Sequence, residues 1–71
     1  MKEYMVVFEW AGSNYSAYVP DLPGCVSTSK TVEDAERNIK EAISLYMETL
    51  REDGKPVPEP SAQVRPVKVA A

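Results

Sequence analysis

Residues 15–25, YSAYVPDLPGC, decide how this chain of 71 residues folds. The first five of these residues alternate between two faces, which is the period of a β-strand. Pro20 ends that strand because it cannot donate a hydrogen bond to a neighbouring strand. Pro23 and Gly24 then predict a tight turn, since proline presets φ and glycine tolerates the conformation that follows. Residues 25–29 read as the next strand, so the stretch predicts two strands joined by a compact turn.

Another strand is predicted upstream, at residues 3–10, EYMVVFEW. Every second residue from Tyr4 to Trp10 is apolar, and the opposite face also carries Met5 and Val7. Residues 11–14, AGSN, have the composition of a turn. Three short strands with tight connections predict an antiparallel meander.

A long amphipathic helix is predicted to begin after Thr31 and to end at Gly54. Thr31 is a good N-cap, with Asp34 at the third helical position, and Gly54 is a natural C-terminal stop. Apolar residues recur at steps of three and four, which predicts one face packed on a sheet. The predicted face comprises Val32, Ala35, Ile39, Ala42, Ile43, Tyr46 and Leu50, widened by Leu45 and Met47.

The last part of the chain is predicted to return to the sheet. Residues 55–60, KPVPEP, favour an extended path and exclude a helix. Residues 63–69 then resemble a fourth strand, at an edge because Pro66 lacks a backbone donor. The sequence therefore predicts an α+β fold of order β-β-β-α-β in two layers: an antiparallel three-stranded meander, one helix and a fourth edge strand. We expect one domain over residues 1–71.

The residue types present argue against an enzyme. The chain has no histidine and one cysteine, which excludes a Ser-His-Asp triad and a cysteine-based metal cage. We expect Cys25 to be a small packed side chain. No apolar run is long enough to span a membrane and no signal peptide is recognisable. The candidates for a residual metal site are Glu9 and Glu41, but both acids also suit ordinary solvent-facing positions. We therefore expect no catalytic residue, no metal and no cofactor.

Charge is distributed unevenly along the chain. Residues 31–54 carry seven acids against Arg37, Lys40 and Arg51, a net charge of −4. Such a helix repels nucleic acid and attracts basic partners, although these charges could equally serve to solvate a helix face. One helix covers one face of a sheet, so aromatic residues on the other face predict an interface and a homodimer.

Residues 15–25 and 31–35, YSAYVPDLPGC and TVEDA, resemble the signature of HicB-type antitoxins, as do the helix end EDG and the segment PVPEP. The similarity covers residues 4–60. It implies a truncated ribonuclease-H-like fold and a partner, a small RNA-cleaving HicA-type toxin (an mRNA interferase) whose active site the antitoxin masks. A ribonuclease H requires acids on its fourth strand, and residues 63–69 contain none. Many members carry a C-terminal DNA-binding module, for which we see no room, so direct DNA binding is not expected.

Three hypotheses follow. The first is a cytoplasmic antitoxin, without a membrane role, that neutralises a basic RNase toxin. The second is a non-catalytic dimeric adaptor, and the third is a residual metal-dependent nuclease that uses Glu9 and a helix carboxylate. For the first hypothesis the expected partner-binding residues lie in the turn and on the acidic helix: Tyr18, Pro20, Asp21, Leu22, Pro23, Gly24, Glu41 and Glu48.

Overall fold

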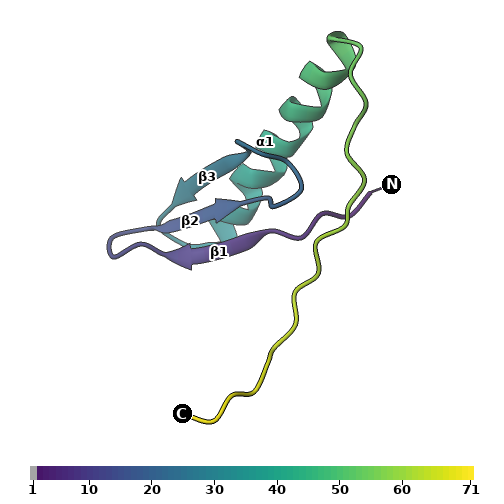
Figure 1. Ribbon diagram of the computed structural model, residues 1–71. Coiled ribbons are helices and arrows are strands. Elements are labelled where there is room, and N and C mark those ends of the chain that lie inside the picture. Colours follow the sequence, from purple (N-terminus) through teal and green to yellow (C-terminus); the bar gives the residue numbers. More distant parts are fainter. Residues whose placement is uncertain (1) are drawn as a thin grey trace.

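The computed structural model describes residues 2–71, which form three strands followed by one helix (Figure 1). The strands are β1 (Val7–Trp10), β2 (Tyr15–Tyr18) and β3 (Val26–Ser29), and the helix is α1 (Val32–Glu52). Both strand pairs are antiparallel and the sheet order is β1-β2-β3. The predicted α+β class, the three-stranded meander and the single helix are confirmed.

The register of the strands assigns each side chain to a face. Phe8 of β1 lies opposite Ala17 of β2, and Ala17 is fully buried, so this row faces the core. The neighbouring row, Val7 opposite Tyr18 and Tyr18 opposite Val26, must therefore face the other way. We call these the inner and outer faces of the sheet.

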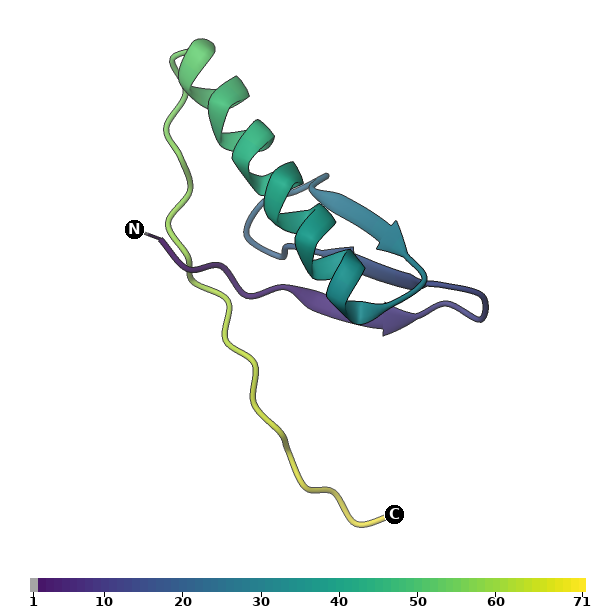
Figure 2. The same ribbon diagram turned by 180° about the vertical axis from the view of Figure 1, so that it is seen from behind.

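The core lies between the inner face and α1, which crosses one side of the sheet (Figure 2). Ala35 and Ile39 are the buried residues of α1, and both lie in its first half. The 21 residues of α1 give it a length of about 32 Å, whereas the strands of 4 residues span only about 13 Å. The helix therefore extends beyond the sheet. The buried core comprises Ala17, Val19, Leu22, Cys25, Ala35 and Ile39.

Both ends of α1 are closed by hydrogen bonds. The Thr31 hydroxyl oxygen accepts the backbone N–H of Asp34 at 3.1 Å, as predicted for the N-cap. At the other end, Gly54 has φ +68° and its N–H donates to the carbonyl of Arg51, while the N–H of Lys55 donates to Leu50. This pair of bonds is a Schellman motif, which satisfies carbonyls that the helix leaves free.

The fourth strand predicted over residues 63–69 is wrong, because this segment forms no ladder with the sheet. Its alternating pattern specifies an extended conformation but not a partner. In this chain the segment continues past the sheet instead of lining its edge (Figure 1). The predicted first strand is also shorter than expected: residues 3–6 approach β1 without pairing.

The prediction that Leu45 widens the buried face of α1 is wrong. Its side chain is 63% exposed. Leu45 follows Ile39 by six positions, which places it about 240° around the helix axis from that buried residue. An apolar residue on this side is therefore directed away from the sheet.

Candidate functional site

The turn at residues 20–24 is rigidly built. The N–H of Leu22 donates to the carbonyl of Val19 at 3.1 Å, and the N–H of Cys25 donates to the carbonyl of Leu22 at 3.0 Å. Gly24, with φ +83°, follows Pro23 in the second of these turns, which is the geometry of a type II turn. The sequence PDLPG thus forms two successive tight turns between β2 and β3.

Asp21 attaches this turn to the C-terminal part of the chain. Its carboxylate accepts the backbone N–H groups of Ser61 and Ala62, each at 3.0 Å, and the Ser61 hydroxyl at 2.8 Å. These bonds favour the ionised carboxylate, so they lower the pKa of Asp21 below its ordinary value of 3.8, the Ala62 N–H contributing most. Asp21 is therefore already engaged within the chain.

The other predicted residues of the turn divide into buried and exposed. Leu22 is fully buried, so its side chain anchors the turn to the core. Pro20, Pro23 and Gly24 are exposed. They form the exposed outer surface of the hydrogen-bonded turn.

Tyr18 lies at the end of β2, on the outer face of the sheet. It is 38% exposed, and its cross-strand neighbours are Val7 and Val26, the latter 62% exposed. The three side chains form an apolar row across the sheet, next to the residues of the turn. The adjacent row on this face is polar, consisting of Glu9, Ser16 and Thr28.

Glu41 and Glu48 lie on the far side of α1. Both are exposed, and they follow Ile39 by two and nine positions, about 200° and 180° around the helix axis. Exposed Leu45 lies between them, and Glu52 continues the same line. We call Glu41, Leu45, Glu48 and Glu52 the acidic helix face.

The structure does not bring all the predicted partner-binding residues together. Tyr18 points away from the sheet on its outer face, whereas Glu41 and Glu48 point away from the helix that packs on the inner face. The two groups thus lie on opposite sides of a two-layer molecule. They are two candidate surfaces, which point mutations can distinguish.

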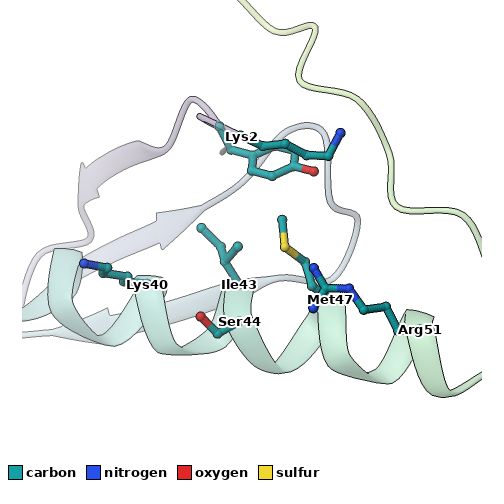
Figure 3. A pocket seen from close by; sticks show the side chains of 7 residues that line it. Lys2, Lys40, Ile43, Ser44, Met47 and Arg51 are labelled. Atoms are coloured by element: carbon teal, nitrogen blue, oxygen red, sulfur yellow. The ribbon is translucent and has the colours of Figure 1, made fainter.

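A cleft of about 560 Å³ lies beside the acidic helix face, between the N-terminal segment and α1 (Figure 3). Three cations, Lys2, Lys40 and Arg51, line it, and no acid does. Lys2 forms an ion pair with Glu59 at 2.6 Å. The net charge of the helix conceals this cleft, because it does not show that Lys40 and Arg51, eleven positions apart, lie on one flank of α1. Its other lining residues are Tyr4, Ile43, Ser44 and Met47.

The acidic side chains and the cysteine considered for chemistry lie apart in the structure. Within residues 2–71, no three His, Cys, Asp or Glu side chains gather where they could hold a metal ion. Glu9 lies on the outer face of the sheet and Glu41 on the far side of α1, so these two carboxylates cannot share a metal. Cys25 is buried in the core as expected, and burial raises the pKa of its thiol, which keeps it protonated. In this part of the chain no helix has the length and apolarity to cross a membrane.

Comparison with known proteins adds a family match and several relatives. The family described as "HicB_like antitoxin of bacterial toxin-antitoxin system" matches residues 4–68. A UPF0150 protein of Synechocystis is 44% identical over 55 residues, which are 78% of this chain and 70% of that protein. A UPF0150 protein of Thermoplasma acidophilum is 36% identical over 63 residues, 89% of this chain and 91% of the relative. A UPF0150 protein of Helicobacter pylori is 53% identical over 47 residues, 66% of this chain and 65% of the relative.

Proposed function

The chain belongs to the HicB-like antitoxin family of bacterial toxin–antitoxin systems, and from this premise we propose that it neutralises a small RNA-cleaving toxin of the HicA type by covering the active site of that toxin. The proposal is one of binding and not of catalysis. The observation that carries it, beyond family membership, is the acidic helix face on a domain whose carboxylates do not converge on a metal-binding arrangement.

The acidic helix face has the chemistry that such a partner requires. A protein that cleaves RNA must present cations to the phosphate backbone. Glu41, Glu48 and Glu52 are exposed along one line of α1, and exposed Leu45 supplies an apolar centre within it. Carboxylates around a leucine can compete with RNA for the same cations, while the leucine adds apolar contact area at the centre of the interface.

The outer surface of the sheet is the alternative contact. Tyr18 with its neighbours Val7 and Val26, and beyond them the exposed prolines of the turn at residues 20–24, form an apolar surface. This observation supports the second candidate function, a non-catalytic adaptor that uses the same fold to hold another protein. A residual nuclease is disfavoured, because Glu9 and Glu41 lie on opposite sides of the molecule.

Further predictions accompany the proposal. We expect the protein to act in the cytoplasm, to form a homodimer and not to bind DNA directly. The net charge of −3 supports the last of these, since a phosphate backbone repels an acidic surface. The relation of this sheet and helix to a ribonuclease-H-like fold also remains a prediction.

An inhibition assay tests the proposal. The purified chain is mixed with a small basic RNase of the HicA type, and RNA cleavage is followed together with complex formation on a sizing column. We expect stoichiometric loss of cleavage and a stable complex. Full cleavage without a complex would overturn the antitoxin proposal and leave the adaptor as the better explanation.

A pair of charge reversals tests the surface. Replacing both Glu41 and Glu48 by Lys should slow association with the toxin and reduce its salt dependence. The matched control replaces exposed Glu33 and Glu36 by Lys, which changes the net charge equally near the start of α1 but outside the acidic helix face. An equal effect of both pairs would mean that only net charge matters and that the acidic helix face is not the contact surface.

A further inference from the structure

The C-terminal segment, residues 62–71, leaves the body of the protein on the side of β1 and makes no pair with its own sheet (Figures 1 and 2). Three valines of this segment are among the most exposed apolar residues described: Val64 at 68%, Val67 at 80% and Val69 at 79%. β-Branched side chains favour an extended backbone, but they gain stability in a strand only when they pack against neighbours. The segment is thus shaped as a strand that lacks a neighbour.

The start of this segment is fixed, so its direction is determined. The Tyr4 hydroxyl donates to the carbonyl of Pro58 at 2.5 Å, and Asp21 holds Ser61 and Ala62. Both contacts lie at the end of the sheet where β1 begins. Beyond them the segment runs away from β1 of its own chain in both views (Figures 1 and 2).

The sheet offers an open edge on the same side. In the order β1-β2-β3, β1 pairs only with β2, so the backbone groups along its other edge have no strand partner among the described residues. An open edge of this kind is a template for an added strand. The C-terminal segment contains Pro66, which lacks a backbone N–H and therefore suits the outermost strand of a sheet.

Charge also favours this pairing. The C-terminal segment carries Arg65 and Lys68 and no acid. Glu9 on β1 and Glu3 before it are both exposed. Opposite charges on neighbouring strands stabilise the pair modestly, and like charges oppose it. The cations of the segment and the acids of the edge therefore match in sign.

We propose that two copies of this chain exchange their C-terminal segments, residues 63–69 of each copy pairing with the β1 edge of the other. The exchange is reciprocal, so a two-fold axis relates the copies and the assembly closes as a dimer. It supplies each sheet with the fourth strand that a single copy lacks. The inference is independent of the toxin, because it concerns an edge of the sheet and not the acidic helix face.

A mixed-label NMR sample tests the pairing directly. One batch of the chain is labelled with ¹⁵N and deuterium, the other with ¹³C, and the two are mixed after unfolding and refolding together. We expect a mass of two chains, with intermolecular NOEs between amide protons of residues 7–10 and the methyl groups of Val64, Val67 or Val69. A mass of one chain, or a dimer without these NOEs, would overturn the proposal.

Matched substitutions test which edge is used. Val67→Asp should weaken dimerisation by about tenfold or more, because a charge replaces an apolar residue in the new interface. The control is Val26→Asp on β3, an exposed apolar site on the opposite edge (62% exposed, against 80% for Val67), which should leave the dimer intact. Equal weakening by both variants would assign the dimer to the outer face of the sheet. Since Val67 lies outside the core, the helical circular dichroism should stay unchanged.

A charge exchange gives an independent check. Glu9→Lys should weaken the dimer, and combining it with Arg65→Glu and Lys68→Glu should restore the affinity, because each interface again pairs opposite charges. A combined variant that binds no better than Glu9→Lys alone would argue against contact between the segment and β1.

Discussion

The carboxylate of Asp21 binds both the backbone N–H and the hydroxyl of Ser61, which lies forty positions further along the chain. This contact ties the turn between β2 and β3 to the point where the C-terminal segment leaves the body. It fixes two things at once: the conformation of the turn that carries the exposed prolines, and the direction of residues 62–71.

Asp21 makes this attachment sensitive to acid. Its pKa is lowered because the Ala62 and Ser61 donors stabilise the ionised form. The contribution to stability is therefore complete above the ordinary value of 3.8 and is lost as the pH falls through the lowered pKa. We expect the amide resonances of Ser61 and Ala62 to shift in that acidic range. Asp21→Asn should abolish this titration, and a titration that persists in the variant would assign it to another group.

Leu22 should prove essential for folding and not for direct contact with a partner. Its side chain is fully buried, so Leu22→Ala leaves a cavity and should cost about 2–5 kcal/mol of unfolding free energy. Val26→Ala is the control, because Val26 is 62% exposed and should change stability by less than about 0.5 kcal/mol. Urea titrations of both variants decide the matter, and a small loss for Leu22→Ala would mean that the turn is held by its hydrogen bonds alone.

Thr31 should contribute a measurable part of the helix stability. Its hydroxyl caps α1 at the N–H of Asp34, so Thr31→Ala should lower the free energy of unfolding by about 1 kcal/mol. Thr28→Ala provides the comparison, since Thr28 is exposed on the outer face of the sheet. Thermal denaturation followed by circular dichroism distinguishes the two, and equal midpoints would show that water replaces the cap without cost.

Leu45 separates binding from stability. Because its side chain is 63% exposed, Leu45→Ser should change the free energy of unfolding by no more than about 0.5 kcal/mol. If the acidic helix face contacts the toxin, the same change should weaken the complex by about tenfold, as expected for an apolar residue at the centre of an interface. Calorimetric titration of the toxin measures the affinity, and unchanged affinity would direct attention to Tyr18 and the turn.

Local chemistry in the sequence was enough to predict most of the fold. Thr31 and Gly54 mark the ends of α1 because caps depend on neighbouring residues, and the turn at residues 20–24 follows from its prolines and glycine. The alternating pattern of residues 63–69 predicts a strand but not the strand with which it pairs, because pairing depends on residues that are distant in the sequence. That is why the predicted fourth strand is absent from this chain.

The candidate site was harder to predict for the same reason. Residue type alone did not reveal that Asp21 is engaged by Ser61, or that Leu22 is directed into the core, because both facts depend on distant contacts. Periodicity averaged over the helix places Leu45 near the buried face, whereas its angle from Ile39 places it on the exposed side. Glu41 and Glu48 are exposed, and their separation from Tyr18 becomes clear only when the two layers of the fold are known.

The difference in length between α1 and the sheet has a consequence for how the molecule opens. Both buried residues of α1, Ala35 and Ile39, lie in its first half, whereas Ile43 and Tyr46 of the second half are only partly buried against the core. Regions with few buried contacts open at low free energy, whatever the stability of the whole. Amide hydrogen exchange should therefore rise along α1 toward Glu52, and the portion that carries Glu48 can fray and re-form while the sheet stays folded.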